Sequence, residues 1–95
     1  MTVTVITAEF RKAGRKFSGS VFWEKDSLPC LTARLYPVDS DGIAGGAVWS
    51  SVFHCNDSKA EKRMMRRLLE AARFRGLELL KKRYTVYSKT HALRA

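Results

Sequence analysis

Residues 58–83 read SKAEKRMMRRLLEAARFRGLELLKKR, and at their start the periodicity of apolar residues changes from strand-like to helix-like. Apolar side chains recur there at spacings of three, four and seven residues, which is the pattern of a helix with one buried face. The members of this apolar stripe are Met65, Leu68, Leu69, Ala72 and Leu79. The spacing predicts one long amphipathic helix over about 58–83, followed by a short tail over 84–95.

Both ends of this helix have recognisable signals. Ser58 and Glu61 have the spacing of a capping box, in which the hydroxyl accepts from an orphan N–H and the carboxylate reaches back. Gly76 can act as a C-terminal cap, so the helix can also end there instead of running to Arg83. Residues 85–87 are compatible with a short extra strand.

Residues 2–55 alternate polar and apolar side chains with a period of two, which favours strands over a helix. Leu31, Ala33 and Leu35 occupy one face of such a strand, and Arg34 and Tyr36 occupy the other. The four predicted strands cover residues 2–10, 17–24, 30–38 and 47–54.

Turn-forming residues separate these strands. Gly14 supplies the positive φ that a tight hairpin needs. Pro37 lacks an N–H and therefore limits its strand to an edge or ends its pairing. The order of elements predicts a single α+β domain over residues 1–95, with a four-stranded antiparallel sheet followed by one long helix packed on one face. The second face of the sheet is left for solvent or a partner.

The composition is strongly basic. Eighteen Lys and Arg face nine Asp and Glu, for a net charge of +9. A positive field of this size attracts polyanions, of which nucleic acid is the commonest. An anionic membrane surface and simple solubility are the alternative explanations.

The predicted helix carries most of this charge. Like charges four residues apart, such as Lys62 with Arg66, each cost a few tenths of a kcal/mol. A helix that tolerates several such pairs favours a phosphate-contacting face over an ordinary solvated one. The candidate contact residues opposite the apolar stripe are Lys59, Lys62, Arg63, Arg66 and Arg73.

Two further sites are candidates for nucleic-acid contact. Tyr36 shares a strand face with Arg34, and exposed sheet aromatics can stack on unpaired bases. A basic hairpin tip can enter a groove or straddle a phosphate backbone. The tip residues are Arg11, Lys12, Arg15 and Lys16.

Catalytic and metal-binding patterns are not recognisable. His54 and His91 lie far apart in the sequence, outside any metal-ligand motif. Asp39 and Asp41 flank a turn, where short acidic side chains favour the turn itself. We therefore expect no enzyme activity, no cofactor and no metal, although a nuclease assembled from scattered carboxylates stays as a third hypothesis.

The cysteines and the apolar segments of the sequence bear on the cellular compartment. Cys30 and Cys55 match no metal-ligand spacing, and whether they pair is left open. Neither a signal peptide nor a stretch of about 20 apolar residues is present. We expect a cytoplasmic protein with no membrane partner, and the oligomeric state is left open.

Parts of the chain resemble known nucleic-acid-binding families. The strand Val48–His54 followed by Ser58–Lys62 is similar to the end of double-stranded-RNA-binding domains, whose helix lysines grip phosphates; Lys59 and Lys62 are the matching positions. The same strands and helix look like the sheet-reading domain of plant ethylene-response factors and of some integrase arms. The chain lacks the first helix of the former family and the Gly and Trp pattern of the latter at Leu31–Tyr36.

The overall build is also similar to small phage-encoded inhibitors of host defence, of the anti-CRISPR or anti-nuclease type. This resemblance rests on size, charge and the lack of a catalytic motif. It implies an inhibitor that docks on a host CRISPR or nuclease complex, in the host cytoplasm, and blocks access to nucleic acid. The direct expectation is a non-enzymatic protein that binds RNA or DNA, alone or on the nucleic-acid path of a nucleoprotein complex, through phosphate contacts.

Overall fold

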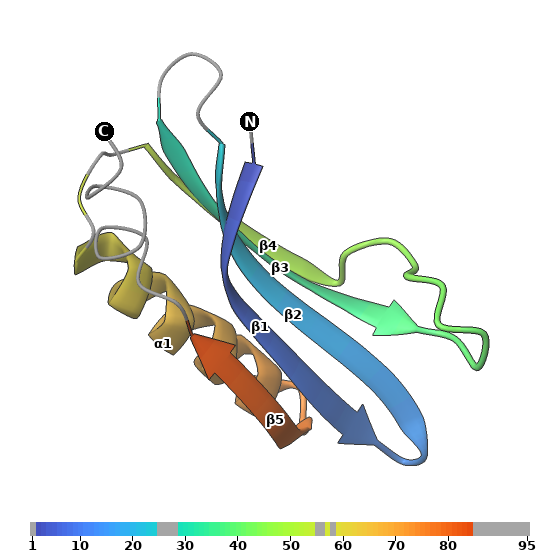
Figure 1. Cartoon of the computed structure of the whole chain (residues 1–95). Helices are drawn as coiled ribbons and strands as arrows, with labels where there is room; N and C mark the ends of the chain where they lie inside the picture. Colours follow the sequence, from blue (N-terminus) through green and yellow to red (C-terminus); the bar gives the residue numbers. More distant parts are fainter. Residues whose placement is uncertain (1, 25–28, 55–56, 58, 85–95) are drawn as a thin grey trace.

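The computed structural model describes residues 2–24, 29–54, 57 and 59–84. Five strands and one helix follow each other along the chain (Figure 1). They are β1 (Thr2–Lys12), β2 (Arg15–Glu24), β3 (Cys30–Val38), β4 (Trp49–His54), α1 (Lys59–Phe74) and β5 (Glu78–Tyr84).

The strands form one antiparallel sheet in the order β4-β3-β2-β1-β5, and α1 lies across one face of it (Figure 1). The helix packs most extensively against β3. The predicted α+β class with a single helix is therefore confirmed. The predicted number of strands is wrong, because a fifth strand follows the helix and pairs with β1.

The helix ends nine residues before the predicted limit of 83, at Phe74. Gly76 has a φ of 73°, a left-handed conformation that favours glycine. Its N–H donates to the carbonyl of Arg73, and the N–H of the buried Leu77 donates to the carbonyl of Ala72. These two bonds form a Schellman motif, which satisfies the last helical carbonyls and turns the chain back toward the sheet.

Residues predicted to extend the helix therefore belong to β5. Phe10 pairs with Leu79, and Glu9 pairs with Lys81. Leu and Lys are good helix formers, so local propensity over 78–84 favours a helix. The open edge of β1 overrides that propensity once Gly76 has ended α1. The strand predicted at residues 85–87 lies outside the described residues.

The remaining strands agree with the prediction to within two residues, and β4 begins at Trp49 instead of residue 47. Residues 30–38 form β3 with the predicted bounds, and β1 and β2 each extend two residues further toward their turn. That turn consists of Ala13 and Gly14, with φ values of 50° and 78°. Two consecutive positive φ values are typical of the type I′ turn that suits a two-residue hairpin.

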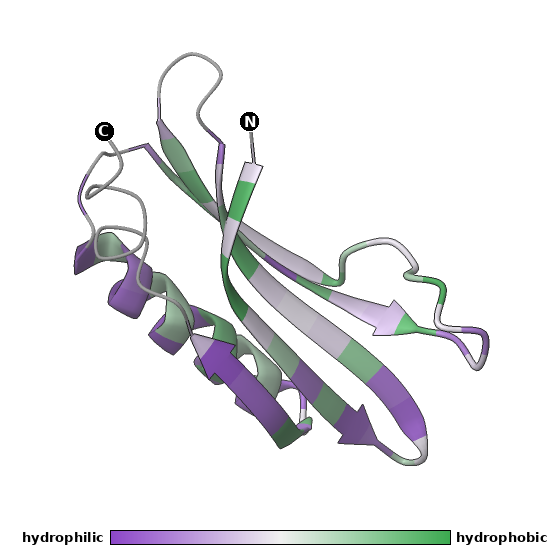
Figure 2. Cartoon of the chain, viewed as in Figure 1, coloured by the Kyte–Doolittle hydropathy of each residue, from purple (hydrophilic) through white to green (hydrophobic). Residues whose placement is uncertain are grey.

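The core lies between α1 and the facing side of the sheet, and Figure 2 shows apolar positions alternating along the strands. Gly19 on β2 is the point of closest approach. A Cβ built there would lie 2.9 Å from Leu68 Cδ1 and 3.2 Å from Phe10 Cε2. The absence of a side chain at Gly19 thus lets the fully buried Leu68 seat against the sheet.

One carboxylate is buried inside this layer. Glu61 is completely inaccessible and accepts a hydrogen bond from Trp23 Nε1 at 2.8 Å and another from the Tyr84 hydroxyl at 3.4 Å. Partial burial, together with the nearby charge and hydrogen bond of Glu61, raises the pKa of Tyr84. Glu61 therefore links α1 to β2 and β5. Ser58, the other half of the predicted capping box, lies outside the described residues.

Candidate nucleic-acid interface

The outer face of α1 carries the predicted helix cations, all exposed. At about 100° per residue, they fall within an arc of about 100° around the helix axis, opposite the buried stripe. Glu70 is the only acid on that arc within Lys59–Phe74. None of the five cationic side chains has an ion pair or hydrogen bond with the described residues, and the backbone N–H of Lys59 donates to the Asp57 carboxylate at 2.9 Å. This outer helix face consists of Lys59, Lys62, Arg63, Arg66 and Arg73.

Two residues beside this face were not predicted as site residues. Phe74 is 89% exposed, although it is a large apolar side chain. Arg67 donates to the Ser51 hydroxyl at 3.3 Å, which joins the helix to the outermost strand, β4. Arg75, predicted as a helix cation, instead lies beyond α1 and donates to the carbonyls of Ala71 and Val48.

Of the four cations at the hairpin tip, two make polar contacts within the fold and two do not. Arg11 forms an ion pair with Glu78 at 3.0 Å, and Lys12 donates to the carbonyl of Arg75 at 2.8 Å. Arg15 lies over the Phe17 ring at 5.8 Å, and Lys16 has no polar partner among the described residues. Only Arg15 and Lys16 are therefore available to a ligand without breaking a charge-assisted contact.

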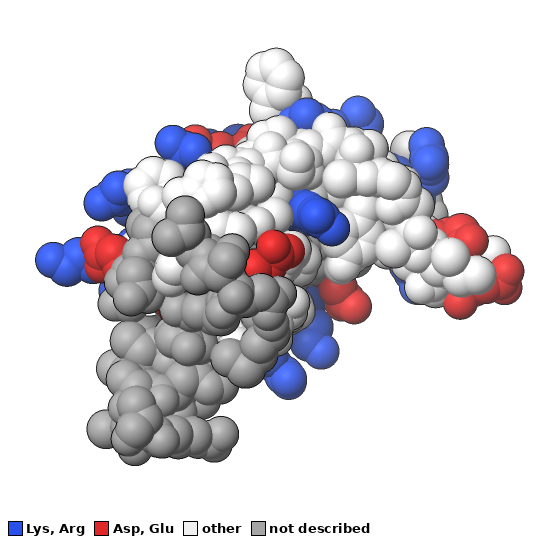
Figure 3. Space-filling model, turned by 90° about the horizontal axis from the view of Figure 1, so that it is seen from above, with Lys and Arg blue, Asp and Glu red and all other residues white. Residues whose placement is uncertain are grey.

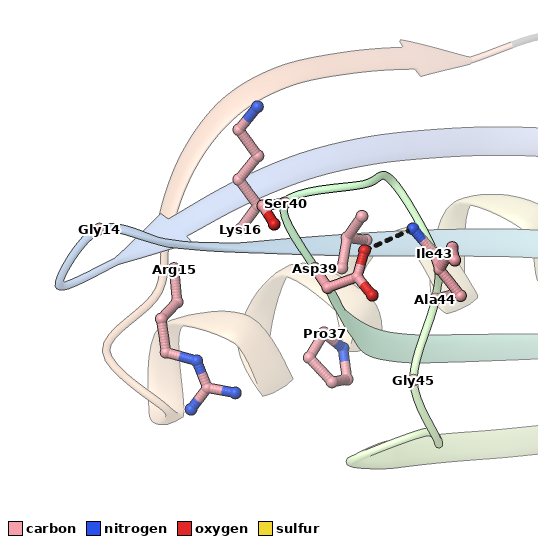
Figure 4. Close-up of a pocket in the computed structure, with 10 residues that line it drawn as sticks. Gly14, Arg15, Lys16, Pro37, Asp39, Ser40, Ile43, Ala44 and Gly45 are labelled. Atoms are coloured by element: carbon pink, nitrogen blue, oxygen red, sulfur yellow. Dashed lines mark hydrogen bonds between the residues drawn. The ribbon is translucent and has the colours of Figure 1, made fainter.

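Arg15 and Lys16 line a hollow of about 750 Å³ between the hairpin tip and the loop after β3 (Figure 4). The carboxylate of Asp39 in that loop accepts from the backbone N–H groups of Asp41 and Ile43, both at 2.9 Å. The prediction that Asp39 serves its turn is confirmed.

The sheet face opposite α1, called here the open sheet face, holds the predicted Arg34 and Tyr36. The strand registers place Arg34 in a row across all five strands. Its guanidinium lies 5.5 Å from the centroid of the Phe22 ring, a cation–π distance. The row consists of Ser50, Arg34, Ser20, Thr7 and Arg83.

A second row lies beside the first on the open sheet face and contains Tyr36, Ser18, Glu9 and Lys81. Lys81 and Arg83 fall within the predicted helix range 58–83, and that prediction is wrong. As members of β5 they add positive charge to the open sheet face instead. Gly76 was the signal in the sequence: a helix that ends there leaves Lys81 and Arg83 to the strand that follows.

The predicted site residues thus do not form one patch. The outer helix face and the open sheet face lie on opposite sides of the molecule, with the hairpin tip at one end of the sheet. Figure 3 shows Lys and Arg as separate groups around the surface, with uncharged surface between them. A ligand that touches both faces has to wrap around an edge of the sheet.

The open sheet face also carries a histidine, a thiol and a carboxylate, the side-chain types that bind metal ions. On the open sheet face the register places His54 opposite Cys30 and Cys30 opposite Glu24. The Cys30 thiol donates to the Glu24 carboxylate at 3.9 Å. In the described part of the chain, no three His, Cys, Asp or Glu side chains gather into a set able to hold a metal ion. Cys55 and His91 lie outside that part.

No helix among the described residues is long and apolar enough to cross a membrane. Comparisons with family models, with curated proteins and with solved structures found no match to this chain.

Proposed function

We propose that this protein is a non-catalytic binding module that holds nucleic acid by its phosphate groups, on the outer face of α1. The observation that carries the proposal is that the side chains of the five cations on that face have no acidic partner among the described residues. Asp or Glu side chains placed between these cations would cancel the repulsion among the cations, but Glu70 is the only acid on this arc within Lys59–Phe74. Phosphates supply the missing negative charge, and their condensed counterions are released on binding.

A helix face suits the phosphate backbone because its long side chains reach a curved line of charges without needing a pocket. Contacts of this kind fix position and give affinity but do not read base sequence. We therefore expect binding to both RNA and DNA with little sequence preference, in the cytoplasm.

The test is fluorescence anisotropy with a labelled 20-base-pair duplex across a salt series. About four to six phosphate contacts predict that log K falls linearly with log salt, with a slope of about −0.9 per phosphate. Arg63→Glu with Arg66→Glu should weaken binding more than tenfold with the fold intact. Arg63→Lys with Arg66→Lys keeps the charge and should bind like the parent protein. Unchanged affinity in a folded charge-reversal variant contradicts the proposal.

A second candidate function is docking on a protein of a nucleoprotein complex, as an inhibitor of a host CRISPR or nuclease machine would do. The exposed Phe74 beside the outer helix face favours it, because exposed aromatic side chains among cations are typical anchors of protein interfaces. A pull-down from host lysate, with and without nuclease treatment, separates the two. Partners that persist after nuclease treatment and are lost in Phe74→Ser support docking on protein, whereas partners lost with the nucleic acid support direct binding.

The proposal also predicts no cleavage. Purified protein with added Mg²⁺ or Mn²⁺ should leave labelled RNA and DNA intact. Metal-dependent cleavage that disappears when His54, Asp39 or Asp41 is replaced would reassign the basic surface to a nuclease.

A further inference from the structure

Three hollows on the open sheet face share lining residues, and together they are called here the open-face trough. Their volumes are about 440, 380 and 220 Å³. Tyr36 lines the first and second hollows, and Ser18 and Glu9 line the second and third. The open-face trough therefore runs from the loop before β4 across β3, β2 and β1 to β5, a path of three strand spacings or about 14 Å.

Tyr36 is half-buried, and small residues lie on both of its cross-strand sides. Its cross-strand neighbour on β2 is Ser18. On its other side β4 has not yet begun, and the hollow there is lined by Gly45 and Gly46 instead of a strand. Large residues on these two sides would fill the space next to Tyr36, whereas the small ones leave a hollow on each side.

The charges along the trough favour an anionic ligand. The cations Lys16, Arg34, Lys81 and Arg83 line its hollows, against one carboxylate, Glu9. Serine and threonine hydroxyls from neighbouring strands lie between the cations and can donate to phosphate or base edges.

We propose that the open-face trough binds unpaired nucleotides, with one base stacked on the ring of Tyr36 and the adjoining phosphates held by Arg34 and by the cations of β5. An aromatic ring beside a groove of positive charge is the arrangement that holds single strands with little sequence preference. Bases inside a duplex are stacked on each other, so their faces are not available to Tyr36. The inference rests on the proposed function for the kind of ligand, but it assigns a different surface and a narrower class, single-stranded RNA or DNA.

The experiment measures two labelled probes on the same protein, an oligouridine 12-mer and a 20-base-pair duplex. Tyr36→Val keeps a strand-forming residue but removes the ring, and should weaken 12-mer binding about tenfold while duplex binding is unchanged. Tyr36→Phe keeps the ring and is the matched control, with both affinities unchanged. Unfolding curves for each variant verify that the sheet is intact.

A positional readout uses the protein without substitution, so it holds even where Tyr36→Val lowers stability. A 12-mer carrying 5-iodouridine should crosslink on irradiation at Tyr36, located by mass spectrometry of the tryptic peptide. Folded Tyr36→Val that binds the 12-mer like the parent protein, or crosslinks found only on α1, would overturn the trough and leave the proposed function standing. If the parent protein binds neither probe, the proposed function fails, and the trough fails with it.

Discussion

The outer helix face and the open sheet face both present a majority of cations, yet the surroundings of those cations differ. On α1 the five cations project from the convex surface of the helix, with one acid, Glu70, among them. On the sheet, Arg34 lies against the ring of Phe22, and hydroxyl side chains and hollows separate it from Arg83. Similar charge on two faces therefore predicts two kinds of contact, with the backbone on one side and with unpaired bases on the other.

The core between α1 and the sheet holds both the outer helix face and the open sheet face in place, and Leu68→Ala tests this role of the core. Leu68 is fully buried and contacts the sheet at Gly19, so its truncation should destabilise the fold by about 2–5 kcal/mol. Urea denaturation measures the loss. Arg66→Ala, on the opposite side of the same helix, is the control and should stay within about 0.5 kcal/mol of the parent. An equal loss in both variants would mean that α1 is not seated on the sheet as described.

Salt dependence should sharpen the contrast between the two faces. Arg63→Glu with Arg66→Glu removes about two phosphate contacts and should make the slope of log K against log salt shallower by about 1.8 on the duplex. Tyr36→Val should leave that slope unchanged, because the duplex is held on α1 and does not contact the trough. Anisotropy titrations between about 50 and 200 mM salt measure both slopes. A shallower slope in Tyr36→Val would indicate that the duplex also contacts the trough.

Tyr84 connects β5, which contributes Lys81 and Arg83 to the open sheet face, to the helix side through Glu61. Its pKa is raised from the ordinary value of 10.0, first by burial and then by the charge and hydrogen bond of Glu61. The folded state therefore favours the neutral phenol. This contribution to stability is complete below pH 10 and is lost as the pH rises through the raised pKa.

Tyr84→Phe should cost about 1 kcal/mol at neutral pH through the lost hydrogen bond. It should also flatten the decline in stability above pH 10. Urea denaturation at neutral and alkaline pH measures both effects, with Tyr36→Phe as the matched tyrosine control. An unchanged alkaline decline in Tyr84→Phe would show that another group is responsible.

The smallest expected effect concerns the hairpin tip, a third basic region at the end of the sheet. Ala13 has a φ of 50°, a conformation that costs about 1 kcal/mol for a residue with a Cβ. Ala13→Asn creates the Asn-Gly pair preferred in type I′ turns and should raise stability by about 0.5 kcal/mol. Thermal unfolding measures the gain. Affinity for both probes should stay the same, since the substitution leaves Arg15 and Lys16 in place; a changed affinity would assign the tip a conformational part in binding.

Local patterns were enough to predict most of the fold. The bounds of β3, the turn at Gly14 and the burial of Leu68 and Ala72 follow from the period of apolar residues and from one glycine. The predicted stripe was wrong in other members, because Met64 and Ala71 are buried instead and Leu79 is exposed on β5. The fifth strand could not be predicted in this way, because residues 78–84 have a helix-forming composition and become a strand only by pairing with the distant β1. Gly76 followed by the apolar Leu77 was the one local sign that the helix ends early.

The same distinction applies to the candidate sites. The outer helix face depends only on residues within one helix, so spacing alone placed Arg63 and Arg66 side by side. The open sheet face depends on the registers of four strand pairs. Spacing could place Tyr36 beside Arg34, but no sequence pattern joins Arg34 to Arg83 across β2 and β1.

The pairing of β1 with β5 also affects the kinetics of folding. Arg11 and Glu78, which meet across these strands, are 67 residues apart in the chain. Closing so long a loop is slow, and during synthesis β1 and β2 leave the ribosome well before β5 exists. Until then β1 is an unpaired edge, a place where nascent chains can associate with each other. Arg11 and Lys12 place charge on this edge, which disfavours its pairing with a second copy. The two cations that hold β5 and the end of α1 in the finished fold therefore also protect the chain while its sheet is incomplete.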